Sequence, residues 1–228
     1  VHDTRLINFL TGMEFDIKDK LSVNFDNRDH AMFRVSADGL AIDGEQLRNL
    51  LVRGEVTDDR ATTSVSLFRG DEPDAPKIEL DATAAADTVG LTAAYTAYKD
   101  DGSVDTRNGG RLLASAALGD TMRVALHESR FALGGTDWNV RRSTMSFLPD
   151  NALEIKRLAV ESGDRHLYVS GRLSKDPADT LDVDLRRVNL AYIFDLVKFD
   201  DVEFDGDVTG LVKATGITSG PNAAGLLK

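Results

Sequence analysis

The chain has 228 residues, of which 42% are hydrophobic and 29% charged, a composition typical of a folded protein with one large or two small domains. The formal net charge of −11 and the lack of any Lys/Arg cluster exclude the basic footprint of a nucleic-acid-binding protein. Because cysteine is absent, disulfides, thiolate metal sites and cysteine nucleophiles are excluded as well.

The beginning of the chain predicts a short helix. An Asp-Thr pair suited to N-capping precedes Leu6, Phe9 and Leu10 at helical spacing, so we expect a helix near residues 4–12. The first residue is Val1 rather than Met, and no stretch has the roughly 20 apolar residues of a membrane helix. We therefore expect a soluble segment of a larger exported protein, with any anchor or export signal upstream.

Period-two alternation of apolar and polar residues dominates the chain from residue 21 onward. The alternating runs lie at 21–25, 51–56, 65–67, 78–82, 122–126, 131–133 and 153–155. Alternation of this kind is typical of antiparallel strands that have one face in water. The runs are separated by turn residues in DDGS, RNGG, LPDN, ESGD and SKDPAD, and we expect Gly109–Gly110 and Gly134–Gly135 to form hairpin turns.

The clearest strand pair is HLYVSGRL followed by TLDVDLRRVNL. Pairing these strands with the strand before them places their apolar residues on one side of a sheet, because a one-residue slip would turn those residues to water. We predict that this side is the floor of an open groove for lipid. Its residues are Leu153, Ile155, Leu158, Val160, Leu167, Val169, Leu173, Leu181, Val183 and Leu185.

A closed hydrophobic core would produce the same pattern, so the sequence leaves two interpretations of these residues open. An aspartate at Val169 or Val183 would distinguish them. In a closed core an unpaired buried carboxylate should unfold the segment. In an open groove the fold should survive while lipid binding is lost.

A second segment with helical spacing follows the strand pair. Ile193, Phe194 and Val197 predict a helix near residues 189–198 that lies across the end of the groove. Since each predicted helix precedes strands, the sequence has a weak internal repeat. The predicted organisation is 1–13 as the short helix of a preceding repeat, 14–188 as a β-sheet repeat body, and 189–228 as a short helix and the start of the next β repeat.

The residue types that carry catalysis do not form a recognisable site. No two histidines have zinc-pair spacing, and we expect His127 and His166 on the polar faces of strands; the others are His2 and His30. Trp138, the only tryptophan, follows a Gly-Gly turn, which favours a packing anchor over a sugar-binding platform.

The acidic residues support the same conclusion. The doublets Asp58–Asp59, Asp100–Asp101 and Asp200–Asp201 fall in predicted turns, where aspartate bonds the local backbone, rather than in a glycosidase-like pair. Asp205 and Asp207 flank a glycine but lack the terminal glutamate of an EF-hand calcium loop. We therefore predict no enzyme activity, no cofactor and no bound metal.

The stretch from Trp138 onward resembles the repeat unit of TamB-type translocation and assembly proteins, within the AsmA-like superfamily. The matching residues are Trp138, Ile155, Leu158, Val160, Gly163, Leu167, Val169, Gly171, Leu181, Val183, Leu190, Gly206 and Gly210. His166 stands where the family pattern has glutamine. The chain before Trp138 matches the family as generic strands.

The resemblance implies a periplasmic segment of a cell-envelope protein that is anchored in the inner membrane upstream. It implies a mainly β fold, an extended twisted antiparallel sheet curled into an open, β-taco-like groove. The expected function is phospholipid transport between inner and outer membranes, outer-membrane protein assembly, or both. The expected partners are phospholipid acyl chains and an outer-membrane barrel protein of the BamA/TamA type, and no nucleic acid.

A second function class remains open from the residues themselves. Alternating strands of this kind also build closed β-sandwiches, which would make the chain a structural or adhesin-like binding module with no lipid role. The two classes differ in whether the apolar face is open along its length or sealed.

Overall fold

The fold is mainly β, with 74% strand. The computed structural model describes residues 15–28, 30–150, 152–176, 178–189, 206–215 and 222–227, and within these ranges there is no helix. Every strand pair whose register is defined is antiparallel, so the predicted mainly β, antiparallel fold is confirmed. Among the described residues, accordingly, no helix is long and apolar enough to cross a membrane.

The prediction of two short helices is not borne out. The segment 4–12 and nearly all of the segment 189–198 lie outside the described residues. Asn189 is the exception: it pairs with Asp207 as the last residue of a strand. The sheet ladder therefore satisfies its backbone where we had expected a helix to begin.

The chain divides into two compact units, residues 1–111 (unit 1) and 112–228 (unit 2). The division falls within one strand, β8 (Val104–Ala117), and inside the segment 14–188 that the sequence presents as a single repeat body. Each unit is built of antiparallel strands.

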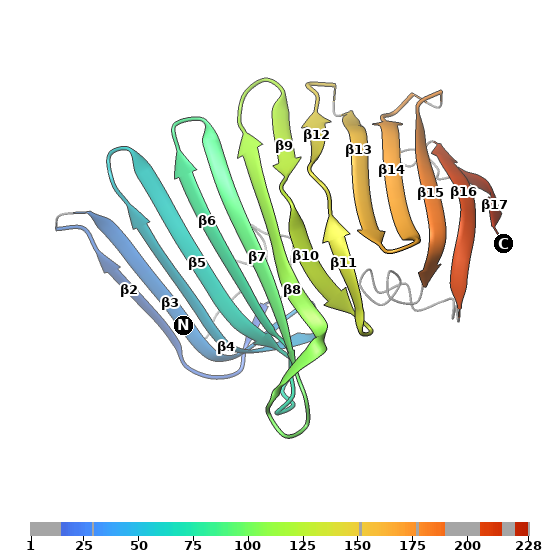
Figure 1. Cartoon of the computed structure of the whole chain (residues 1–228). Coiled ribbons are helices and arrows are strands. Elements are labelled where there is room, and N and C mark those ends of the chain that lie inside the picture. The colour runs from blue at the N-terminus through green and yellow to red at the C-terminus, as the bar shows by residue number, and fades with distance from the viewer. Residues whose placement is uncertain are drawn as a thin grey trace. The chain divides into compact units, whose positions relative to one another are not determined.

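Unit 1 is a run of antiparallel hairpins (Figure 1). Its strands are β1 (Phe15–Ile17), β2 (Leu21–Asp26), β3 (Ala31–Ile42), β4 (Glu45–Val56), β5 (Arg60–Arg69), β6 (Lys77–Ala85), β7 (Thr88–Tyr98) and the first part of β8. The strands from β2 to β7 pair in chain order, and β1 pairs with the end of β3 beyond β2. A turn at Lys99–Ser103, closed by a 2.8 Å backbone hydrogen bond, leads into β8.

The glycine pair Gly109–Gly110 lies inside β8, so the prediction of a hairpin turn there is wrong. The φ angles are 139° and 152°, and a Cβ atom at Gly109 would lie 2.8 Å from the Tyr95 carbonyl oxygen. The pair therefore permits a close backbone approach within the sheet rather than a chain reversal. Gly134 and Gly135 do form the predicted turn.

Unit 2 begins with the end of β8 and continues as antiparallel hairpins. Its strands are β9 (Met122–Leu126), β10 (Ser129–Leu133), β11 (Thr136–Val140), β12 (Ser143–Phe147), β13 (Leu153–Ser162), β14 (Arg165–Leu173), β15 (Thr180–Asn189), β16 (Asp207–Thr215) and β17 (Asn222–Leu227). Strand β9 pairs with β12, and β10 pairs with β11. These four strands therefore form one long hairpin in which each arm is broken into two strands. From β13 to β17 the strands pair in chain order.

The core of unit 2 is a cluster of Trp138, Leu185 and Val188 on one face of the sheet. Trp138 and Leu185 belong to β11 and β15, which are separated by β13 and β14. On a flat sheet this separation would be about 14 Å, at ~4.8 Å per strand, too far for the two side chains to pack. The sheet of unit 2 therefore curls toward this face.

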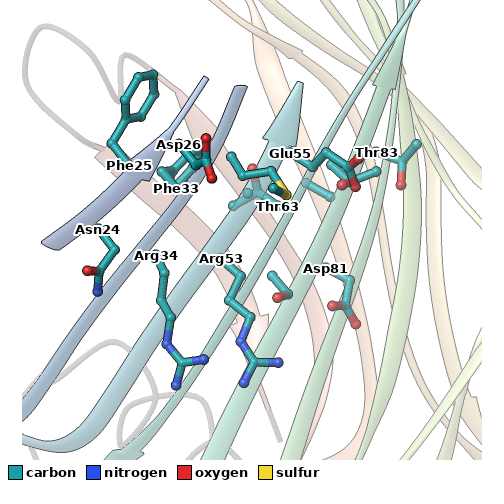
Figure 2. Close-up of a pocket in the computed structure, with 15 residues that line it drawn as sticks. Asn24, Phe25, Asp26, Phe33, Arg34, Arg53, Glu55, Thr63, Asp81 and Thr83 are labelled. Carbon is teal, nitrogen blue, oxygen red and sulfur yellow. The ribbon is translucent and has the colours of Figure 1, made fainter. Parts of the chain in front are cut away.

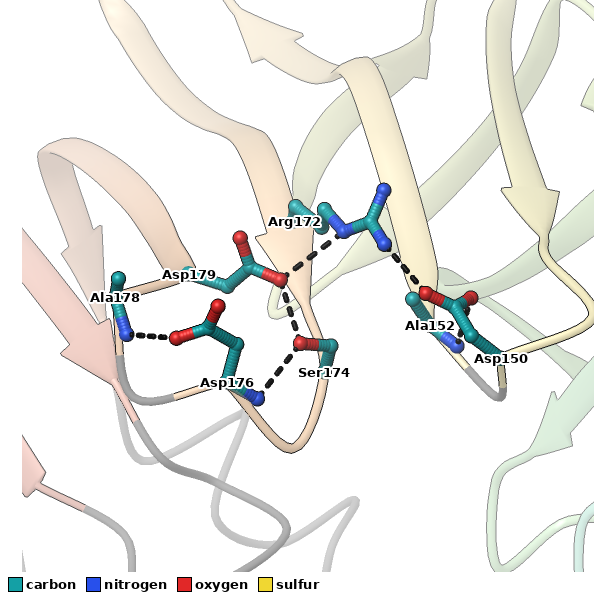
Figure 3. A network of polar contacts seen from close by, with 7 residues as sticks. All are labelled: Asp150, Ala152, Arg172, Ser174, Asp176, Ala178 and Asp179. Atoms are coloured by element: carbon teal, nitrogen blue, oxygen red, sulfur yellow. Dashed lines mark hydrogen bonds and ion pairs between the residues drawn. The ribbon is translucent and has the colours of Figure 1, made fainter.

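A polar network fixes the turn between β14 and β15 to the turn before β13 (Figure 3). The Arg172 guanidinium donates to Asp179 Oδ2 (3.0 Å) and to Asp150 Oδ2 (2.6 Å). The buried hydroxyl of Ser174 donates to the same Asp179 oxygen at 2.5 Å. Asp176 Oδ1 accepts the Ala178 N–H at 2.9 Å. The aspartates of SKDPAD thus act as turn residues, as predicted.

Candidate functional site

The strand registers place all the predicted groove residues on one face of unit 2. In an antiparallel pair, directly opposed residues share a face. The opposed pairs are Leu153 with Leu173, Leu158 with Val169, Val160 with Leu167, Leu167 with Leu185, Val169 with Val183, and Gly171 with both Ile155 and Leu181. A β-bulge between Ile155 and Leu158 inserts one extra residue and keeps both on this face.

This face of unit 2 is largely covered. Ile155 and Leu185 are buried, and the remaining predicted residues are half-buried. Val160, Leu167 and Val183 pack against the cluster around Trp138, which is 6% exposed. Trp138 is thus the packing anchor that we predicted. Among the described residues, its buried indole nitrogen has no hydrogen-bond partner.

Unit 1 has an apolar face that is more open. One row of opposed residues crosses six strands without a polar side chain: Val23, Val35, Val52, Val65, Leu80 and Ala93. Val23 at the β2 end is 60% exposed and Phe25 beside it is 68% exposed. Val56, Leu91 and Tyr95 on the same face are exposed as well. We call this surface, on strands β2 to β7, the open apolar face.

The open apolar face is lined by small side chains between its larger ones. Thr63 and Ala82 sit opposite each other in the row next to Val65. Gly54 belongs to the same row. The Phe33 ring lies over Gly54, because a Cβ atom at Gly54 would be 2.1 Å from Phe33 Cε1. The surface thus offers apolar contact without a deep cavity. It can therefore bind extended apolar groups.

The open apolar face is not among the surfaces predicted from the sequence, although several of its residues follow the alternating pattern. Val23, Val65 and Leu80 belong to the alternating runs identified in the sequence. These residues form one row only because of the register of strands β2 to β6. Alternation within each strand does not specify that register. The ten residues predicted from the sequence to form a groove floor all belong to β13, β14 and β15 of unit 2.

The opposite, polar face of unit 1 carries a trough of about 650 Å³ (Figure 2). Two adjacent rows of opposed residues line it. One row is Asn24, Arg34, Arg53, Ser64 and Asp81, and the other is Asp26, Met32, Glu55, Thr62 and Thr83. The row between them belongs to the apolar face, so its backbone forms the floor of the trough.

The polar face of unit 2 is rich in ion pairs. Glu161 accepts hydrogen bonds from Tyr168 Oη (2.7 Å) and from Arg141 Nε (2.7 Å), which together lower the pKa of its carboxyl group. The Arg157 guanidinium lies 4.8 Å from the centre of the Tyr168 ring, and the His166 ring stacks on the Tyr168 ring with the two ring centres 4.2 Å apart. These contacts tie neighbouring strands together. Arg157 and Tyr168 also line a pocket of about 490 Å³, together with the charged residues Lys156, Asp182, Asp184 and Lys213.

The candidate catalytic and metal residues are scattered. Asp58–Asp59 and Asp100–Asp101 lie in turns, whereas Asp200–Asp201 and Asp205 lie outside the described residues, as does His2. His30 is exposed, but His127 is half-buried and its Nε2 lies 2.9 Å from Ser115 Oγ. His166 is half-buried too and lies on the polar face of β14, as predicted, whereas His127 falls between β9 and β10 rather than in a strand. Within the described ranges, no His, Asp and Glu side chains gather into a group that could hold a metal ion.

Fold and surface together define a class: an antiparallel β protein whose sheets have one apolar and one polar face, with the apolar face of one unit open. Comparisons of the chain with known protein families, with curated proteins and with solved structures find no match.

Proposed function

We propose that this chain is a segment of a cell-envelope protein that carries phospholipid acyl chains along an apolar sheet face. The open apolar face of unit 1 is the observation that carries the proposal. An exposed apolar surface of this extent is a common mark of a binding site. An acyl chain laid on it would gain ~0.8 kcal/mol for each CH₂ group removed from water. The resemblance of residues 138–228 to the TamB repeat supports the same function.

Under this proposal, unit 1 rather than the predicted residues of unit 2 holds the lipid. Val23 and Phe25 are more than half exposed, whereas Leu185 is 5% exposed and packs against Trp138. An acyl chain can contact the first pair without displacing any side chain. In unit 2 it would have to separate the cluster, which costs the packing energy of the core.

The alternative, a structural or adhesin-like β-sandwich, demands that the apolar face be sealed. The exposure of Val23, Phe25 and Leu91 speaks against a sealed face in unit 1. The covered face of unit 2 is compatible with either function. By the TamB resemblance, the parent protein would be anchored in the inner membrane, lie in the periplasm and work with an outer-membrane barrel of the BamA/TamA type.

Site-specific photocross-linking tests the proposal. A photoreactive amino acid is placed at Val65 on the apolar face or at Ser66, its half-buried neighbour on the polar face of the same strand and outside the trough. The purified chain is illuminated with phosphatidylethanolamine–phosphatidylglycerol vesicles, and lipid adducts are measured by mass spectrometry. We expect adducts at position 65 and few at position 66. Equal labelling, or none at either position, would contradict the proposal and favour the sandwich class.

A further inference from the structure

Two like charges face each other on the polar face of unit 1. Arg34 on β3 and Arg53 on β4 are direct cross-strand partners, and both side chains are exposed. Like charges in directly opposed positions destabilise a sheet. Within the described residues, neither guanidinium makes an ion pair or a hydrogen bond. The pair therefore retains its full positive charge and its donors.

The surroundings of this pair form a recess rather than a flat surface. Both arginines line the trough of about 650 Å³, and in Figure 2 their side chains run parallel, with the guanidinium groups next to each other. Asn24 is opposite Arg34, and Ser64 is opposite Arg53. The amide and the hydroxyl thus continue the same row on either side of the two charges and add hydrogen-bond donors to it.

The carboxylates of the trough leave the arginine pair uncompensated. Asp26 is bound by Arg28, with Nη2 2.5 Å and Nε 3.0 Å from its oxygens, an interaction that lowers the pKa of the Asp26 carboxyl. Glu55 lies in the other row of the trough. Asp81 is opposite Ser64, one strand beyond it. Glu55 and Asp81 thus line the same trough as the two arginines, but within the described residues neither carboxylate forms an ion pair with Arg34 or Arg53.

We infer that Arg34 and Arg53 form a binding site for a phosphate group on the polar face of unit 1. A phosphate carries up to two negative charges and several oxygens, so it can accept donors from both guanidinium groups at once. A single carboxylate has one charge and would leave the second arginine uncompensated. The size of the trough admits a substituent on the phosphate in addition to the phosphate itself.

This site is separate from the proposed acyl-chain surface. The row that contains Arg34 and Arg53 points to the polar side of the sheet, whereas Val35 and Val52, adjacent to them in sequence, point to the apolar side. The inference therefore does not depend on lipid transport. The phosphate could belong to a soluble ligand or to a lipid headgroup, and the two sources share the chemistry recognised here.

The test measures phosphate binding by isothermal titration calorimetry with inorganic phosphate, and vesicle binding with phosphatidic acid vesicles, whose headgroup is a phosphate monoester with up to two negative charges. The variant is Arg34→Gln/Arg53→Gln, and the control is Arg111→Gln/Arg123→Gln, which removes the same charge from exposed positions outside the trough. We expect saturable binding in the wild type and the control, weakened about tenfold or more in the trough variant, given the strength of charge-assisted hydrogen bonds. Saturable binding of inorganic phosphate would indicate that the natural ligand is a soluble phosphate compound. Saturable binding of the vesicles alone would indicate that it is a lipid headgroup.

Thermal stability gives an independent readout. Without ligand, the trough variant should be at least as stable as the wild type, because it removes a repulsive pair. Whichever ligand saturates the wild type, inorganic phosphate or the vesicles, should raise the melting temperature of the wild type and the control but not of the trough variant. The inference is overturned if neither phosphate nor vesicles saturate the wild type, or if the trough variant and the control bind alike.

Discussion

The two units have the same alternating pattern and the same antiparallel pairing, yet their apolar faces differ in exposure. In unit 2 the large Trp138 side chain meets Leu185 and Val188 from strands that would be too distant on a flat sheet, and the face is covered. In unit 1 valines and small residues form the corresponding rows, and Val23 and Phe25 remain exposed. The comparison shows that alternation determines which side of a sheet is apolar, whereas bulky residues and curvature determine whether that side is available.

The largest expected contrast comes from placing a charge on each apolar face. Leu185→Asp, at a 5% exposed position, should destabilise unit 2 by about 3–5 kcal/mol because the carboxylate has no partner. Val23→Asp, at a 60% exposed position, should change stability by less than ~0.5 kcal/mol. Urea denaturation measures both, with Trp138 fluorescence reporting unit 2 and far-UV circular dichroism the whole chain.

The same experiment applied to Val183→Asp tests the groove originally predicted in unit 2. Val183 packs against the Trp138 cluster, so we expect this variant to unfold unit 2. A folded Val183→Asp protein that had lost lipid binding would restore the prediction of a groove there. Ser22→Asp, on the polar face next to Val23, is the control for the unit 1 substitution.

Two glycines in similar sequence surroundings should respond differently to alanine. Gly171 in unit 2 has φ 126°, and a Cβ atom there would lie 2.2 Å from the Thr180 carbonyl oxygen, so Gly171→Ala should cost ~1–3 kcal/mol. At Gly54 in unit 1 the obstacle is the Phe33 ring, which can move over the open face, so Gly54→Ala should cost under ~1 kcal/mol. Equal losses of unfolding free energy for the two variants, measured by chemical denaturation, would show that the Phe33 ring is held as rigidly over Gly54 as the Thr180 backbone is beside Gly171.

The polar network of unit 2 should make a smaller contribution. Arg172→Ala removes the link between Asp150 and Asp179, and we expect a loss of about 1 kcal/mol, because the groups are partly exposed but act as a network. Arg130→Ala, which breaks the exposed pair with Asp137, should cost less than ~0.5 kcal/mol. A loss for Arg172→Ala no greater than for Arg130→Ala would mean that the turns do not depend on the network.

The smallest effect is a dependence on pH at Glu161. Hydrogen bonds from Tyr168 and Arg141 lower the pKa of Glu161 in the folded state, so the ionised carboxylate stabilises the fold. This contribution is present above the unfolded pKa of about 4.3 and is lost as the pH falls through the lower folded pKa. The stability difference between the wild type and Glu161→Gln should therefore be largest near neutral pH and shrink in acid. A stability difference that grew in acid would mean that folding raises the pKa of Glu161 instead of lowering it.

The sequence was sufficient to predict what depends on local pattern. Alternation correctly indicated antiparallel strands, and it placed Leu167, Val169, Leu181 and Val183 on one face. It could not predict that Trp138 would cover part of that face, because this contact joins β11 to β15 and depends on the curl of the sheet. The prediction of a turn at Gly109–Gly110 was wrong because a glycine pair is also required where two backbones approach closely, as Gly109 does to Tyr95. The glycine pair alone does not distinguish the two cases.

The trough illustrates a second limit of sequence reasoning. Arg34 and Arg53 are separated in the chain, and each is by itself an ordinary polar residue in an alternating strand. Only the register of β3 with β4 makes them neighbours. No spacing rule for catalytic or metal sites covers such a pair, because it is produced by two strands and not by one motif.

The row from Val23 to Ala93 runs across the strands, and this orientation has an evolutionary consequence. It extends about 24 Å over six strands, at ~4.8 Å per strand. A duplicated hairpin would lengthen it by ~10 Å without altering any existing contact inside the row. An even number of inserted strands keeps the antiparallel order, so the length of such a surface can change by gene duplication in hairpin-sized increments, while its width is determined by strand length alone.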